Sequence, residues 1–237
     1  MKVVPDSRDN FIWLLGALIF LLFADAIFAQ LELRQGQRLI NITLMVTIVA
    51  AVWSVGGAQG RWTNWKVGMS FIIVSLMISD SLLESNFLAL YQLSAIFIFL
   101  IVTLHLCWKQ VMFRGVVDGN KVIGAICIYI LIALIWAFAY LIVEHLFPGS
   151  FRGLEKGVWQ HNLEELTYFS MVTVTTLGYG DITPQQPLAH FLAYMEAITG
   201  IFYTTVLVAS LIGMRLAHYS EKIHHEHDEH AKQEERV

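Results

Sequence analysis

The decisive stretch of this sequence reads Thr-Thr-Leu-Gly-Tyr-Gly-Asp, from Thr175 to Asp181. It follows a short helix that we predict over residues 163–175, with Glu164 and Glu165 in the first turn, where acids complement the positive end of the helix dipole. Such a helix is too short to cross a bilayer, which takes about 20 apolar residues. A short helix that runs into irregular, glycine-containing backbone predicts a re-entrant segment rather than a membrane span.

The two glycines of this stretch suit a backbone that turns its carbonyl groups to one side. Gly178 and Gly180 are alternate residues, and stacked carbonyls require alternate residues in left-handed conformations, which glycine adopts readily. A dehydrated cation needs a cage of oxygen atoms in place of its water shell, and backbone carbonyls supply one. The Thr176 hydroxyl can add further oxygens below them. The side chains of Leu177 and Tyr179 then point away from the axis into surrounding protein.

Residues beside the stretch are candidates for its support. Tyr168 and Phe169 on the short helix are natural packing partners for Tyr179. Thr175 and Asp181 bound the stretch at its two ends. Asp181 either raises the local cation concentration at the outer mouth or braces the stretch by hydrogen bonding, and we favour the brace.

The composition places this stretch in a membrane protein. The 237 residues are 57% hydrophobic and 14% charged, whereas a soluble domain carries about 25% charged residues. The net charge of −4 and the lack of a dense basic patch exclude a nucleic-acid partner. Cys107 and Cys127 lie toward the cytoplasmic ends of neighbouring apolar runs, where a disulfide is not favoured, so we predict free thiols.

Six apolar runs predict an all-α membrane protein with six transmembrane helices. The runs cover about residues 11–31, 39–55, 66–83, 87–108, 122–147 and 188–217. The first lacks a convincing small-residue cleavage site, so we expect a spanning helix and not a signal peptide. Most Lys and Arg residues face the cytoplasm if the N-terminus lies inside. This predicts a multi-pass protein of the cell membrane (inner or plasma membrane), in contact with the lipid bilayer, with both termini cytoplasmic.

The stretch from Thr175 to Asp181 resembles the selectivity filter of potassium channels, which more commonly has valine where Leu177 stands. Residues 120–218 resemble the two-helix pore module of that family, and further segments resemble its bacterial members: Glu144, Pro148–Phe151 and Ile182–Pro184. The resemblance implies that K⁺ binds to backbone carbonyls and to one threonine hydroxyl. The K⁺-binding residues are then Thr176, Leu177, Gly178, Tyr179 and Gly180. Because one filter segment cannot close a ring, we expect a homotetramer around one axis.

The chain divides into three predicted parts. Residues 1–115 resemble the four-helix voltage-sensor domain, residues 116–219 form the pore domain, and residues 220–237 form a His- and Glu-rich cytoplasmic tail. A voltage sensor needs three or four gating charges per subunit, but the fourth run contains no Lys or Arg. We therefore expect no strong voltage gating. Asp25, within the first run, is either functional or solvated near the outer interface.

Two further positions are compared with the family pattern: Val172 departs from it and Gly200 matches it. Some relatives carry an acidic residue on the pore helix where Val172 stands, so inactivation that depends on such a carboxylate is in doubt. Gly200 stands where relatives place a hinge glycine. It either permits a bend or lets another segment approach closely, and both readings remain open. From there, Thr204, Val208 and Ile212 recur on one helix face as candidates for the cavity and gate lining.

The tail places histidines among acids: His224, His225, His227 and His230. These side chains titrate near pH 6.5 or bind a transition metal. The alternative is a solvated helical extension or a tail of low order.

Together these features predict a K⁺-selective channel that conducts passively and is not an enzyme, with no cofactor other than K⁺ ions in the filter. A weakly selective cation channel is the alternative, although the intact Gly178-Tyr179-Gly180 argues against it. A K⁺ transporter subunit is a third reading, but its relatives carry several pore loops in one longer chain. A membrane sensor with a vestigial pore is the fourth.

Overall fold

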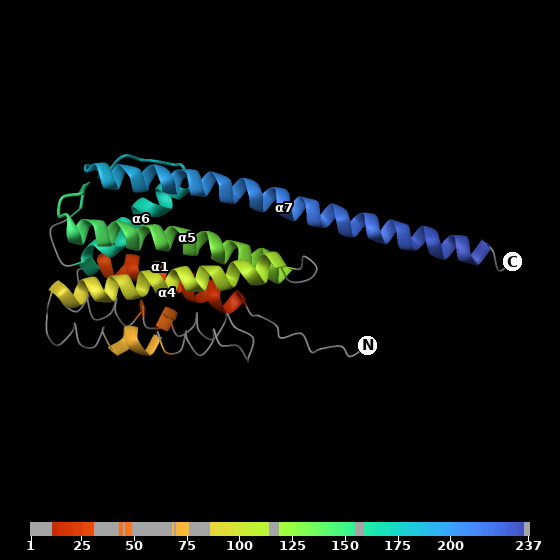
Figure 1. The fold of residues 1–237 in the computed structure, drawn as a ribbon, viewed down its shortest axis with the longest axis horizontal. Helices are drawn as coiled ribbons and strands as arrows, with labels where there is room; N and C mark the ends of the chain where they lie inside the picture. The colour runs from red at the N-terminus through yellow and green to blue at the C-terminus, as the bar shows by residue number, and fades with distance from the viewer. Residues whose placement is uncertain are drawn as a thin grey trace.

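The chain is mostly helical. The computed structural model describes residues 11–30, 43–44, 46–48, 68, 70–75, 86–113, 119–154 and 159–234. These residues form α1 (Phe11–Gln30), α4 (Asn86–Phe113), α5 (Gly119–Leu146), β1 (Phe151–Arg152), α6 (Trp159–Val174), β2 (Thr183–Pro184) and α7 (Pro187–Glu234) (Figure 1). The second and third predicted spans lie largely outside the described residues. The first, fourth and fifth predicted spans correspond closely to α1, α4 and α5.

Helix α5 lies at the centre of the fold and packs against α1, α4, α6 and α7. Its sequence is apolar on every side, which is typical of a helix that is buried or spans a membrane. Small residues let its neighbours approach closely. A Cβ atom on Gly124 would lie 2.7 Å from Val111 Cγ2 and 3.0 Å from the ring of Phe11.

The start of α1, the end of α4 and the start of α5 therefore meet at one end of the bundle. The Cys127 thiol also lies 3.6 Å from the carbonyl oxygen of Phe11. The predicted topology places these three points on one side of the membrane, and the structure agrees with that arrangement. Cys107 and Cys127 are both buried free thiols, as predicted.

Helix α7 is far longer than the sixth predicted span. It runs without interruption over 48 residues, from Pro187 to Glu234. At about 1.5 Å per residue this is about 70 Å, more than twice the thickness of a hydrocarbon core. Figure 1 shows its C-terminal half extending well beyond the other helices. The end of the predicted span near Ala217 stays a prediction, and the helix itself continues through most of the His-rich tail, as in the helical extension that the sequence left open.

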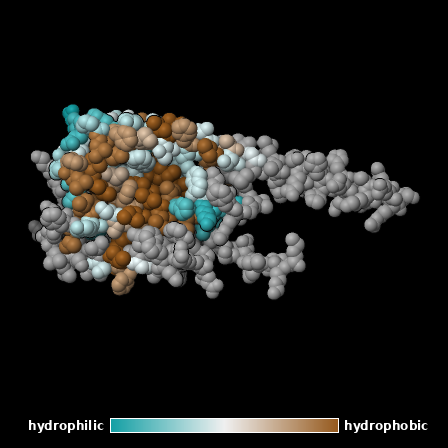
Figure 2. All heavy atoms as spheres, viewed as in Figure 1, coloured by the Kyte–Doolittle hydropathy of each residue, from teal (hydrophilic) through white to brown (hydrophobic). Residues whose placement is uncertain are grey.

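Hydrophobic side chains cover much of the described surface. The face in Figure 2 carries a broad hydrophobic area between hydrophilic groups at its two ends. Two described helical segments are long and apolar enough to cross a membrane, Leu88–Val111 and Gly119–Leu146, and Phe11–Ala24 is a shorter apolar segment. Large apolar side chains such as Trp13, Phe23 and Tyr91 are exposed. This surface is that of a membrane protein, because soluble proteins rarely expose apolar patches of this extent.

Candidate functional site

The short helix α6 leads directly into the glycine-containing stretch. It begins at Trp159 and spans 16 residues, so it starts earlier than predicted. Its first turn holds no acidic residue. The prediction that Glu164 and Glu165 occupy the first turn is therefore wrong, because the turn that precedes them is also helical. The helix ends at Val174, close to its predicted end.

The backbone after α6 alternates between ordinary and left-handed conformations. The φ angles of Thr176, Gly178 and Gly180 are 60°, 55° and 81°. The two glycines adopt the conformation expected from the sequence. Thr176 adopts it as well, although a left-handed residue with a Cβ atom costs about 1–2 kcal/mol. Three alternate left-handed residues are the pattern that the sequence analysis expects of a segment with stacked carbonyl groups.

The C-terminal turn of α6 anchors this segment through backbone hydrogen bonds. The Val172 carbonyl accepts hydrogen bonds from the amides of Leu177 at 2.9 Å and Gly178 at 3.3 Å. The Thr176 amide donates to the Thr173 carbonyl at 2.9 Å. These bonds satisfy the last carbonyl groups of the helix, which otherwise lack partners. They fix the start of the stretch to the end of α6.

The outer end of the stretch is braced by a side-chain pair. The Tyr168 hydroxyl donates a 2.7 Å hydrogen bond to Asp181 Oδ2, and Asp181 Oδ1 accepts from the Ile182 amide at 3.0 Å. Of the two roles left open for Asp181, the structure shows the geometry of the brace. Tyr168 thus contacts the carboxylate that follows Gly180.

The hydrogen bond between Tyr168 and Asp181 shifts the pKa values of both side chains. The hydrogen bond from Tyr168 lowers the pKa of Asp181, and the same hydrogen bond raises the pKa of Tyr168 to about 12. The ionised Asp181 carboxylate therefore stabilises the folded state above its ordinary pKa of about 3.9, and this stabilisation is lost as pH falls through the lowered value. The stabilisation by Tyr168 is present below its ordinary pKa of about 10 and is lost as pH rises to about 12. The brace is therefore intact across the physiological range.

Phe169 contacts aromatic side chains of α5 and β1. Its ring packs edge-on against Tyr140 of α5 and Phe151 of β1, with centroid distances of 5.2 and 5.5 Å. The packing of Phe169 on Tyr179 stays a prediction. Phe169 holds α6 against α5 and the following turn.

The turn after α5 is organised by one carboxylate. Glu144 accepts hydrogen bonds from the amide of Gly149 at 2.7 Å and the amide of Phe151 at 3.1 Å. Gly149 has a φ of 85°. Residues 144–151 thus form one compact turn.

This turn is clamped to the segment that follows the stretch. Strand β1 pairs with β2 in antiparallel fashion, with Phe151 opposite Pro184 and Arg152 opposite Thr183. Gly153 then passes close to the backbone, because a Cβ atom there would lie 2.6 Å from the Asp181 carbonyl oxygen. The flanking segments singled out in the sequence therefore meet around Asp181.

Gly200 of α7 packs directly against the end of α6. A Cβ atom at this position would overlap the Val174 carbonyl oxygen and lie 3.0 Å from the carbonyl carbon. Of the two roles left open for Gly200, the structure shows close packing. Helix α7 continues through this position without interruption.

The other predicted gate residues also lie on α7. Thr204 is exposed in the single chain, and its hydroxyl hydrogen-bonds the carbonyls of Gly200 and Ile201, both at 3.0 Å. The side chains of Val208 and Ile212 lie outside the described residues, so their role in the gate stays a prediction. The same holds for the tail histidines, whose backbone is helical.

The sequence analysis missed two buried side chains of α7. Glu196 is fully buried between α5 and α6. Tyr203 donates a 2.6 Å hydrogen bond to the Ala125 carbonyl and stacks on Tyr129 with centroids 5.7 Å apart. An ionisable residue within a predicted span is a functional candidate by default. That signal was available for Glu196.

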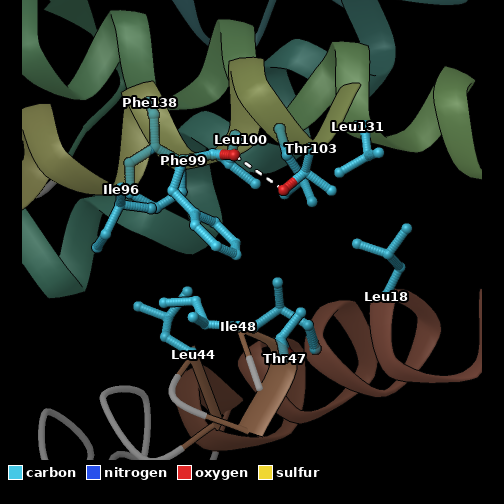
Figure 3. A pocket seen from close by; sticks show the side chains of 12 residues that line it. Leu18, Leu44, Thr47, Ile48, Ile96, Phe99, Leu100, Thr103, Leu131 and Phe138 are labelled. Atoms are coloured by element: carbon cyan, nitrogen blue, oxygen red, sulfur yellow. Dashed lines mark hydrogen bonds between the residues drawn. The ribbon is translucent and has the colours of Figure 1, made fainter. Parts of the chain in front are cut away.

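The first helices offer an apolar pocket rather than a polar site. Figure 3 shows it between α1, the helical piece around Leu44, α4 and α5. Its two threonine hydroxyls are bonded within their own helices, Thr47 to the Thr43 carbonyl at 2.9 Å and Thr103 to the Phe99 carbonyl at 2.8 Å. Both hydroxyl protons are therefore used within their own helices, and the other described lining residues are apolar. Asp25 has its backbone in α1, but its side chain lies outside the described residues.

Comparisons with known proteins find similarities to ion channels. A family model described as "Ion channel" matches residues 125–215. The chain is 34% identical over 92 residues to the inward rectifier potassium channel Kirbac3.1 of Paramagnetospirillum magnetotacticum, covering 37% of this chain and 27% of that protein. It is 32% identical over 85 residues to a voltage-gated potassium channel of Aeropyrum pernix, covering 35% of this chain and 26% of that protein.

A plant protein gives a similar match. The two pore potassium channel c of Oryza sativa subsp. japonica is 30% identical over 87 residues, covering 35% of this chain and 19% of that protein. The chain thus spans about a fifth to a quarter of the length of these relatives. No solved structure matches the chain. These likenesses support the potassium channel superfamily, and the family model matches residues 125–215, from α5 to α7.

Proposed function

We propose that this chain is the subunit of a K⁺-selective channel that conducts passively across a cell membrane. The observation that carries the proposal is the alternation of left-handed residues at Thr176, Gly178 and Gly180. This backbone suits a row of carbonyl oxygens that replaces the hydration shell of K⁺. We assign K⁺ coordination to Thr176, Leu177, Gly178, Tyr179 and Gly180, with Thr175 and Asp181 as supports.

The ring that surrounds the ion is proposed to come from four copies of the chain. Leu177 and Tyr179 are 57% and 67% exposed in the single chain. Large side chains of α7, such as Phe191, Ile198 and Phe202, are exposed as well. A neighbouring subunit would cover these side chains and complete the ring of carbonyls, because a single segment cannot surround an ion.

Strong voltage gating is not part of the proposal. The described helix α4 contains one basic residue, Lys109, which lies near its end. A steep voltage response needs several gating charges in each subunit. Control by pH or metal through His224, His225, His227 and His230 stays a prediction.

The test is the reversal potential of purified full-length protein in liposomes that separate K⁺ from Na⁺. We expect a value near the K⁺ equilibrium potential. Gly178→Ala should shift it toward zero, since the new Cβ strains a left-handed residue of the filter. Gly149→Ala places similar strain in the outer turn and should leave selectivity unchanged. A wild-type value near zero would instead favour the weakly selective cation channel, and failure to conduct at all would favour a sensor with a vestigial pore.

A further inference from the structure

A carboxyl group buried on α7 joins three helices behind the filter. Glu196, Tyr140 and Ser170 all have no solvent-exposed surface. Glu196 Oε2 contacts the Tyr140 hydroxyl of α5, and Glu196 Oε1 lies 2.5 Å from the Ser170 hydroxyl of α6. Ser170 Oγ also lies 2.6 Å from the Ala133 carbonyl oxygen of α5. The network thus contains three short oxygen–oxygen contacts.

Each of these contacts needs one proton. Tyr140 has a single hydroxyl proton for Glu196 Oε2. Ser170 also has a single proton, yet both of its neighbours are oxygens that accept. If Glu196 were ionised, one of the two contacts of Ser170 would join two lone pairs at hydrogen-bond distance, which is repulsive. A protonated Glu196 resolves this, because it donates to Ser170, which then donates to Ala133.

We infer that Glu196 is a neutral carboxylic acid that positions the pore helix by donating a hydrogen bond to Ser170. This inference deepens the proposed channel function and depends on it for its conduction measurements. The hydrogen bonds of Glu196 go to Tyr140 and Ser170 and not to residues 175–181, so it acts on the filter through α6.

The network lies where the pore helix holds the filter. Ser170 is two residues before Val172, whose carbonyl anchors Leu177 and Gly178. The ring of Tyr140 packs edge-on against Phe169 with centroids 5.2 Å apart. One acid on α7 therefore fixes the face of α6 that lies against α5. A glutamine can reproduce every hydrogen bond of the protonated acid, because its amide accepts from Tyr140 and donates to Ser170.

The first test does not require conduction. Infrared spectroscopy of the purified full-length wild-type protein at neutral pH should show a protonated carboxylic carbonyl band that is absent from Glu196→Gln. Tyr140→Phe should shift this band, because it removes the hydrogen bond to Oε2. Tyr203→Phe is the matched control, since it removes another buried tyrosine hydroxyl between α7 and α5 and should leave the band in place. A wild-type protein without a band attributable to Glu196 would overturn the inference whether or not the protein conducts.

The second test compares K⁺ flux in liposomes. Glu196→Gln should retain wild-type flux within about twofold. Glu196→Ala should reduce the flux about tenfold. It leaves the buried hydroxyls of Tyr140 and Ser170 without their partner, and the free-energy cost of such a group corresponds to roughly a tenfold change in the population of the intact network. If Glu196→Gln lost flux as severely as Glu196→Ala, the side chain would act as a carboxylate and the inference would be wrong. If wild type showed the band but no flux, the protonated network would stand and the proposed function would fall.

Discussion

Substitution of Gly200 by alanine tests the contact between α7 and the end of α6. The added Cβ would overlap the Val174 carbonyl oxygen and lie 3.0 Å from the carbonyl carbon. Comfortable carbon contacts lie at about 3.5–4.0 Å, so α6 and α7 must separate by about 1 Å at this point. Neither partner can rotate away, because the obstruction is backbone. Overpacking of this kind costs about 1–3 kcal/mol.

The assay pairs stability with conduction. The thermal midpoint of the purified assembly and its K⁺ flux should both fall for Gly200→Ala, since the shifted carbonyl belongs to the last residue of the helix that anchors the filter. Gly213→Ala is the matched control on the same helix, because a Cβ there meets nothing within 4 Å. That control should be neutral or stabilising by about 0.5–1 kcal/mol, the usual gain in a helix interior. Wild-type stability and flux in Gly200→Ala, or equal damage from Gly213→Ala, would refute the packing argument.

Three further predictions concern the outer face. Tyr168→Phe removes the brace at every pH, so it should raise the pKa of Asp181 toward its ordinary value and lower conduction already at neutral pH. It should also remove the further fall in conduction that we expect in wild type as external pH rises from about 10 to 12. An unchanged pH profile of K⁺ current would contradict the brace. Gly153→Ala should lower the thermal midpoint more than Gly149→Ala, because both introduce left-handed strain but only Gly153 would also clash with the Asp181 carbonyl, at 2.6 Å, at a further cost of about 1–3 kcal/mol; equal midpoints would contradict the close approach. Glu144→Gln should destabilise the turn by about 1 kcal/mol, since the amide can accept only one of the two backbone hydrogen bonds, and denaturant unfolding would show this as a lower transition midpoint.

The parts of the site that sequence predicts well are those set by local backbone chemistry. The alternation of Gly178 and Gly180 implies left-handed conformations wherever the chain folds, and the structure has them. The left-handed Thr176 could not be expected from its own side chain, because its conformation is imposed by hydrogen bonds to the end of α6.

Features that depend on residues distant in the sequence could not be predicted from it. Whether Gly200 bends or packs is decided by Val174, which comes from another helix. Glu196 lies in an apolar run that predicts a helix correctly, but its role follows from Tyr140 and Ser170, which approach it only in the folded chain. The start of α6 was misplaced because apolar and acidic patterning does not mark where its first turn begins.

The continuous α7 helix has a mechanical consequence. Its contact with Val174 at Gly200 divides it into a short arm of about 20 Å toward Pro187 and a long arm of about 50 Å toward Glu234. If the helix turns about that contact as a stiff rod, a sideways movement at the Glu234 end reaches the Pro187 end at about two-fifths of its size and in the opposite direction. A modest force applied at the far tip is correspondingly multiplied at the short arm. The same fold can thus convert a large, weak displacement at the Glu234 end of α7 into a small, forceful one at the Pro187 end.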